Sequence, residues 1–217
     1  MKRRVAPRAG LMSSAKVKVC GITRWDDALL AADLGASAVG FVFWPRSPRY
    51  IEPAAAAAIA LDLPADVAPV GVFVDPTASE VQRIAARVGL AAVQLHGNEP
   101  ATLCDGLPYR VLKAVPVAGS ATHHAVDRVP TRVTLLLDAR DPVRKGGTGR
   151  TVDWTLAADV AARRRVFLAG GLRPENVGEA LRTVRPYGID VSSGIESQPG
   201  RKDAGRLRHF FEEVARA

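Results

Sequence analysis

Short apolar runs alternate with amphipathic stretches along most of this chain. The runs have the length of β-strands and lie at 16–20, 38–43, 69–74, 92–95, 110–115, 133–137, 165–168 and 188–191. Most of them are apolar at successive positions instead of alternate ones, a pattern typical of strands that are covered on both faces. The sequence therefore predicts a parallel sheet with helices packed against it.

Helical signals follow each of these runs. Helices are expected at 25–34, 53–61, 77–88, from about 99, and at 120–128, 155–162, 174–184 and 203–215. Val81, Ile84 and Val88 fall on one stripe of the third segment, and Pro174 stands at a helix start, where proline is tolerated. Thr23 is placed to cap the first helix.

These strand and helix units predict a single (β/α)₈ barrel, the TIM-barrel fold, over residues 16–217. An open doubly wound sheet is the alternative architecture. The glycine-rich G-x-G-x-x-G turn expected after the first strand of such a sheet is missing, which favours the barrel.

The opening segment, MKRRVAPRAGLMSSA, lacks this pattern and is basic. The chain has a net charge of +8, and Lys2, Arg3, Arg4 and Arg8 all lie in this segment. We expect residues 1–15 to form a disordered basic extension, with Met12 as an alternative start. A module that binds an anionic partner through this extension is a competing interpretation.

The rest of the composition limits the classes of partner. The remaining positive charge is scattered, and aromatic residues make up only 6% of the chain, too few for a base-stacking surface, so we expect no nucleic-acid partner. A small anionic substrate fits the charge balance. No apolar run reaches the roughly 20 residues that span a bilayer, and no secretory signal is present, so we expect a cytoplasmic protein without membrane contact. Cys20 and Cys104 have neither a disulfide framework nor a metal-ligand spacing.

In a parallel barrel, functional groups lie where the strands end and the following loops begin. Cys20 ends the first strand, where a helix start and nearby cations favour the thiolate that acts as base or nucleophile; an inert core cysteine is the alternative. Asp138 follows a run of leucines, where desolvation favours the neutral acid that can donate a proton. A helix cap or an ion pair with Arg140 is the alternative for this residue.

Three more residues lie at or near strand ends. Arg49 belongs to a loop stiffened by Pro45 and Pro48, and its planar guanidinium suits a carboxylate. Asp190, in the last strand, is a candidate substrate-binding residue. His96 is expected to make a structural hydrogen bond.

Three glycine-rich segments can hold a phosphate through backbone N–H groups. They are the KGGTGR loop, the glycine pair after the seventh strand, and the VSSG segment at a short helical turn after the eighth. In many barrels the loops after the last two strands bind a phosphate together. The residues concerned are Gly147, Gly149, Gly170, Gly171, Ser192, Ser193 and Gly194.

Several of these segments, taken in order, resemble the phosphoribosylanthranilate isomerase family of tryptophan biosynthesis. They are KVCGITR, GFVFWPRSPRYI, GVFV, VQLHG, LLLD, GGTGRTVDW, LAGGLRPENV, DVSSGIE and PGRKD. The resemblance implies a (β/α)₈ barrel that uses no cofactor and no metal. It also implies an Amadori rearrangement of a small phosphosugar, in which N-(5-phosphoribosyl)anthranilate becomes 1-(2-carboxyphenylamino)-1-deoxyribulose 5-phosphate.

The same resemblance implies roles for individual residues. Cys20 matches the general base, Asp138 the general acid, and Arg49 the clamp for the anthranilate carboxylate. The glycines after the seventh strand and the Ser-Ser-Gly after the eighth match the phosphate site. A related barrel isomerase of histidine biosynthesis is the alternative, but such barrels have an aspartate where this chain has Cys20. Whether the protein is a monomer or a homodimer stays open.

Overall fold

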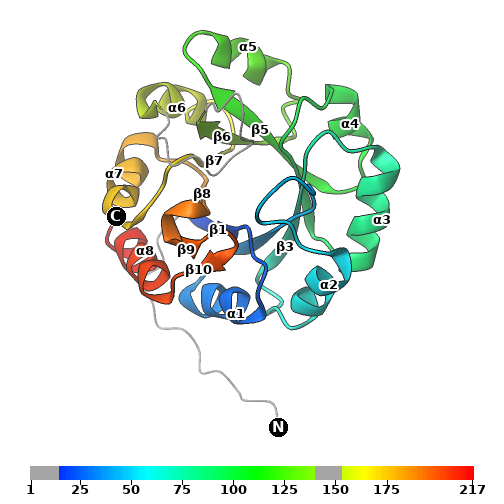
Figure 1. Ribbon diagram of the computed structural model, residues 1–217. Helices are drawn as coiled ribbons and strands as arrows, with labels where there is room; N and C mark the ends of the chain where they lie inside the picture. The colour runs from blue at the N-terminus through cyan, green and yellow to red at the C-terminus, as the bar shows by residue number, and fades with distance from the viewer. Residues whose placement is uncertain (1–14, 140–152) are drawn as a thin grey trace.

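The structure is a computed structural model that describes residues 15–139 and 153–217. Its eight parallel strands form a closed barrel in the order β1 to β8, and the helices surround the barrel as an outer ring (Figure 1). The expected (β/α)₈ barrel is therefore confirmed. The predicted extension at 1–15 lies outside the described residues except for Ala15, as do Gly147 and Gly149.

The observed elements follow the predicted ones closely, and their ends differ from the prediction by about two residues at most. The strands of the barrel are β1 (Lys16–Cys20), β2 (Ala38–Val42), β3 (Ala68–Phe73), β4 (Ala92–Leu95), β5 (Arg110–Val117), β6 (Thr134–Ala139), β7 (Val166–Leu168) and β8 (Gly188–Val191). The helices are α1 (Trp25–Leu34), α2 (Pro53–Leu61), α3 (Ala78–Val88), α4 (Ala101–Gly106), α5 (Ala121–Asp127), α6 (Trp154–Ala161), α7 (Pro174–Val184) and α8 (Ala204–Arg216). Every helix in the described residues is too short or too polar to cross a lipid bilayer.

The barrel interior is filled in layers, because every second residue of a strand points inward. An apolar cluster that includes Val70, Leu112, Leu136 and Phe167 occupies part of this interior. A separate, larger core joins the outer faces of the strands to the helices. With the interior filled in this way, polar groups that take part in chemistry are expected at the carboxyl ends of the strands.

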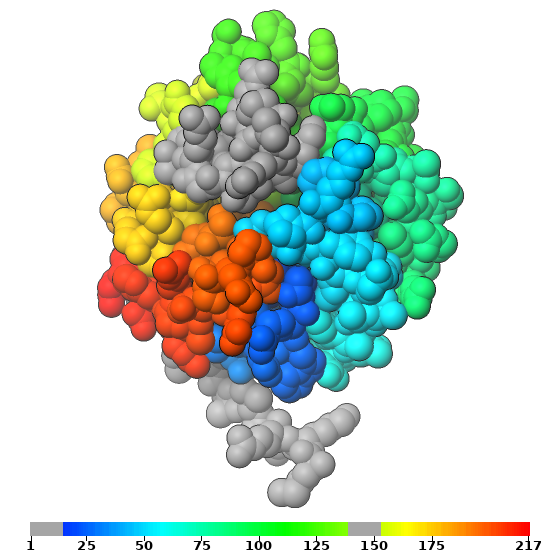
Figure 2. Space-filling view, in the orientation of Figure 1, coloured from blue at the N-terminus to red at the C-terminus, as the bar shows by residue number. Residues whose placement is uncertain are grey.

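A short 3₁₀ turn, η1 (Ser193–Ile195), and a hairpin of β9 (Glu196–Gln198) and β10 (Arg201–Lys202) follow β8. The turn agrees with the prediction for VSSG, but the hairpin was not expected from the sequence. In Figure 2 the segments after β1, β2 and β8, coloured blue, light blue and orange, meet on one face. The expected capping role of Thr23 is wrong: the N-cap of α1 is Arg24, and the Thr23 hydroxyl donates to the carbonyl of Gly200 in the hairpin.

Candidate active site

Cys20 and Lys18 share one face of β1 at the carboxyl end of the barrel. A Cβ atom added to Gly40 on β2 would lie 2.9 Å from Cys20 Sγ and 3.0 Å from Lys18 Nζ, so both groups occupy the space that this glycine leaves free. Lys18 is completely buried, and its ammonium contacts Asp190 Oδ1 at 2.7 Å. The thiol therefore lies beside a buried ion pair.

The electrostatics of this group depend on burial and on the lysine. Burial raises the pKa of the Cys20 thiol because it desolvates the thiolate, and the positive charge of Lys18 offsets only part of this effect. The pKa of Lys18 is raised, because the attraction of Asp190 and Cys20 outweighs the effect of burial. The cation expected near Cys20 is present, but the expectation that the surroundings favour the thiolate is wrong, because desolvation is the larger effect.

Asp138 lies near the end of β6, beside a histidine from a neighbouring loop. His96 follows β4, and its Nε2 atom lies 3.3 Å from Asp138 Oδ2. The Gln94 amide nitrogen lies 2.8 Å from His96 Nδ1. The contact holds the ring by its Nδ1 side, so that Nε2 faces Asp138. His96, predicted to make a structural hydrogen bond, therefore also contacts the candidate acid.

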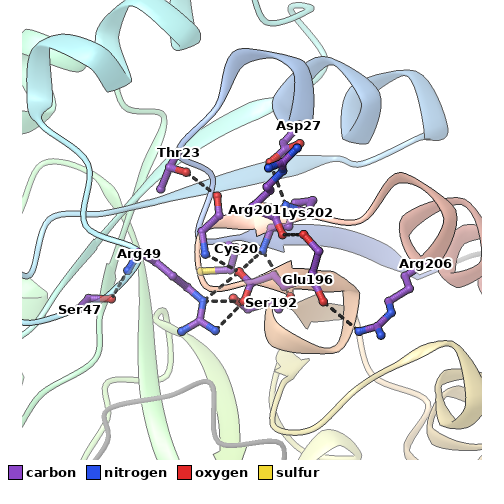
Figure 3. A network of polar contacts seen from close by, with 12 residues as sticks. Cys20, Thr23, Asp27, Ser47, Arg49, Ser192, Glu196, Arg201, Lys202 and Arg206 are labelled. Atoms are coloured by element: carbon purple, nitrogen blue, oxygen red, sulfur yellow. Dashed lines mark hydrogen bonds and ion pairs between the residues drawn. The ribbon is translucent and has the colours of Figure 1, made fainter.

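Arg49 makes a two-pronged ion pair with Glu196, the first residue of β9 (Figure 3). Arg49 Nε lies 2.9 Å from Oε1 and Nη2 lies 2.6 Å from Oε2. Lys202 approaches the same carboxylate, with Nζ 2.9 Å from Oε1, and also donates to the backbone carbonyls of Cys20 and Ser192. Burial would raise the pKa of Glu196, but Arg49 and Lys202 outweigh it and lower that pKa.

The loops after β7 and β8 are in direct contact. Gly170 and Gly171 have φ angles of 81° and 68°, which favour glycine, and a Cβ atom on Gly194 would lie 2.0 Å from the carbonyl oxygen of Leu172. The Asn176 side chain donates to the Gly171 carbonyl and so closes the first loop.

The loop after β8 lies close to Arg49. A Cβ atom on Gly21 would lie 2.6 Å from Arg49 Cδ and 3.2 Å from Ser192 Oγ. Ser192, Ser193 and Gly194 thus lie between the glycine pair and Arg49, while Gly147 and Gly149 remain predictions outside the described residues.

The fold brings most of the candidate residues to one end of the barrel. Cys20, Asp138, Arg49, Gly170, Gly171, Ser192, Ser193 and Gly194 lie there, in or after the carboxyl ends of strands. Asp190 is one layer deeper, paired with Lys18, and its role toward substrate remains a prediction. The residues that sequence reasoning missed are Lys18, Glu196 and Lys202. Lys18 left a signal, since it lies two residues before Cys20 in the same strand and therefore faces the same way. Glu196 and Lys202 lie in the DVSSGIE and PGRKD segments of the resemblance, but no role was assigned to them there.

A metal ion needs several suitable ligands close together. Within 15–139 and 153–217, no cluster of three or more histidine, cysteine, aspartate or glutamate side chains could hold one. The chemistry that the described residues offer is proton transfer by a thiol and a carboxyl group, next to cations that can bind anions.

Residues 17–213 match the family model of N-(5'-phosphoribosyl)anthranilate (PRA) isomerase. The chain belongs to the PRA isomerase family. A relative from Pelobacter propionicus, named N-(5'-phosphoribosyl)anthranilate isomerase, is 46% identical over 90% of this chain and 93% of its own length. The expectation of an isomerase of tryptophan biosynthesis is thus confirmed at the level of the family.

Solved structures of PRA isomerases superpose on this chain over most of its length. The enzyme from Thermotoga maritima superposes with a TM-score of 0.87 at 42% identity, covering 94% of this chain and 100% of that one. Another PRA isomerase structure contains reduced 1-(o-carboxyphenylamino)-1-deoxyribulose 5-phosphate. It superposes with a TM-score of 0.84 at 40% identity, covering 94% and 100% of the two chains.

Proposed function

We propose that this protein converts N-(5'-phosphoribosyl)anthranilate into 1-(2-carboxyphenylamino)-1-deoxyribulose 5-phosphate, with Cys20 as general base and Asp138 as general acid. One observation carries the proposal: a PRA isomerase of the same fold and 40% identity binds the reduced form of this product. The position of the thiol and the carboxyl group, each near the carboxyl end of its strand, supports their roles.

The reaction needs one proton donor and one proton acceptor. Asp138 gives its proton to the furanose ring oxygen, so that the C1–O bond breaks and the sugar opens to a Schiff base. The Cys20 thiolate then removes the proton from C2 and leaves an enolamine. Loss of the enol proton and protonation of C1 give the ketone. Each general acid or base step contributes about 10²–10⁴-fold in typical enzymes.

Two regions at this end of the barrel suit the two anionic groups of the substrate. Arg49 offers a planar guanidinium to the anthranilate carboxylate, as the resemblance to the family implies. The loops that contain Gly170, Gly171 and Ser192 to Gly194 offer backbone N–H groups to the phosphate. We infer that Gly147 and Gly149 contribute to the same binding site, and that the protein is a cytoplasmic monomer or homodimer.

The proposed activity is tested by incubating the purified protein with freshly generated N-(5'-phosphoribosyl)anthranilate and following the loss of aminobenzoate fluorescence. We expect the rate of loss to be proportional to protein concentration and well above the rate of spontaneous decay. A rate no greater than in a reaction without protein would contradict the proposed function.

The Lys18–Asp190 pair provides a second test, because it should set the titration of Cys20. Lys18 lowers the pKa of the thiol and Asp190 raises it, and Lys18 has the larger effect of the two. Replacing both residues, as Lys18→Met with Asp190→Asn, should therefore move the formation of the thiolate to higher pH. Asp190→Asn alone should move it to lower pH. The measurement is the ultraviolet absorbance of the thiolate against pH. It is made in a Cys104→Ala background, where Cys20 is the one remaining thiol of the sequence.

The opposite signs of these two shifts separate the electrostatic role from a change in packing. If both variants move the titration in the same direction, the ion pair does not control the thiol by charge. Lys113→Met is a matched control, since Lys113 is another buried lysine of the barrel but is paired with Glu99 on a different side. It should leave the Cys20 titration where it is.

A further inference from the structure

The ion pair between Arg49 and Glu196 uses only one edge of the guanidinium. A guanidinium carries five N–H donors, on Nε and on two terminal nitrogens. The bonds to Glu196 use Nε and Nη2, and none of the bonds that the described residues make to Arg49 uses Nη1. The end-on edge, formed by Nη1 and the second hydrogen of Nη2, can therefore take another carboxylate in a two-pronged geometry.

Glu196 is itself held firmly. Its side chain is buried and accepts hydrogen bonds from the Lys202 ammonium at 2.9 Å and from the Gly200 backbone at 3.3 Å. Lys202 is anchored in turn, because its backbone N–H donates to Asp27 and its ammonium donates to the carbonyl of Cys20 (Figure 3). The β9–β10 hairpin thus gives Arg49 a fixed partner that is tied to the strand end of the candidate base.

The charges of this network are suited to one further anion. Arg49 and Lys202 are both paired with the single carboxylate of Glu196. The two cations and one carboxylate leave one positive charge in excess, and the three side chains are at most 13% exposed, so this charge is less screened than one on the surface. A substrate carboxylate would balance that charge.

We propose that Glu196 is a positioning residue for substrate recognition: it occupies the side edge of the Arg49 guanidinium and so presents the end-on edge to the anthranilate carboxylate. The inference rests on the proposed function for the identity of that carboxylate. Glu196 does not touch the substrate in this arrangement. It acts through Arg49, and its removal should weaken the recognition of one chemical group only.

The test compares two probes that differ in that group. The first is reduced 1-(o-carboxyphenylamino)-1-deoxyribulose 5-phosphate, and the second is the same compound without the carboxyl group. Glu196→Gln should weaken binding of the first probe by about 10- to 100-fold, the range for a hydrogen bond to a charged group. Binding of the second probe should stay within a factor of about 2 of the wild type, since a neutral ring gives Arg49 nothing to bind. Isothermal titration calorimetry measures both affinities.

Arg49 supplies the companion variants. Arg49→Met should produce the same selective loss, and Glu196→Gln should add little to it, because both changes remove one recognition unit. Glu99→Gln is the matched control, since Glu99 is also a buried carboxylate paired with a buried lysine. Glu99→Gln should leave the ratio of the affinities for the two probes unchanged.

Two outcomes would overturn the role of Glu196: equal losses for both probes, which would indicate a structural role, or no loss for either. If Glu196→Gln does not fold, Glu196→Asp serves instead, because it keeps the negative charge but shortens the reach of the carboxylate toward Arg49, and it should show the same selectivity. Turnover of N-(5'-phosphoribosyl)anthranilate by the wild type is measured separately. Its absence would contradict the proposed function and not the positioning of Arg49.

Discussion

Replacing Cys20 by alanine should lower kcat by about 10²–10⁴-fold, the usual contribution of a general base. The reason is that alanine cannot accept the C2 proton, and the neighbouring ammonium of Lys18 is a donor only. The fold should survive, because the side chain is small and packs against Val42 and Val72 in a minor apolar cluster. The rate of fluorescence loss at saturating substrate gives kcat, and circular dichroism against temperature reports the fold.

Cys104 provides the control for this experiment. It is the other buried cysteine of the described residues and lies in α4, on the outer layer of the barrel. Cys104→Ala removes the same sulfur from a site without a proposed function and should keep kcat near the wild-type value. A Cys20→Ala variant with near-normal kcat would exclude the thiol from the mechanism.

The pH dependence of wild-type activity should also report the ionisation of Cys20. The pKa of Cys20 is raised by burial, so the thiol form predominates below that pKa and the thiolate fraction grows as the pH rises toward it. The value of kcat/KM should therefore rise with pH on the alkaline side of neutrality. In Cys20→Ala, the residual rate should lose this dependence.

The positions of Cys20 and Asp138 could be predicted because they depend on local sequence. Each follows a short apolar run, and a parallel barrel places all such strand ends at one mouth. The helices were predictable for the same reason, since proline at the start of α7 and the apolar stripe of α3 act within a few residues.

The partners of these residues could not be predicted, because they are distant in sequence. Lys18 and Asp190 are 172 residues apart, and Arg49 and Glu196 are 147 apart. A single sequence shows the charges but not which of them meet. Lysine is also almost never fully buried unless it is paired, so composition alone favours a surface position for Lys18.

The direction of the Cys20 pKa could not be predicted for a related reason. The sequence shows two lysines in β1 and a helix after it, and both features favour the thiolate. The opposing effect, desolvation, depends on how completely the barrel mouth encloses the sulfur, and this is a property of the whole fold. The β9–β10 hairpin contributes to that enclosure, because its Lys202 binds the Cys20 carbonyl.

Asp138→Asn should also lower kcat by about 10²–10⁴-fold, because an amide of the same shape cannot deliver a carboxyl proton to the ring oxygen. His96 Nε2 can still contact the amide group, so the loop after β4 should keep its place and KM should change little. Asp105→Asn is the control, since Asp105 is an exposed carboxylate paired with Arg132, and such pairs contribute little to stability. Steady-state kinetics on the wild type and the two variants shows whether each substitution changes kcat or KM. A fall in affinity with unchanged kcat would instead make Asp138 a substrate-binding group, and the proton donor would have to be sought elsewhere at the barrel mouth.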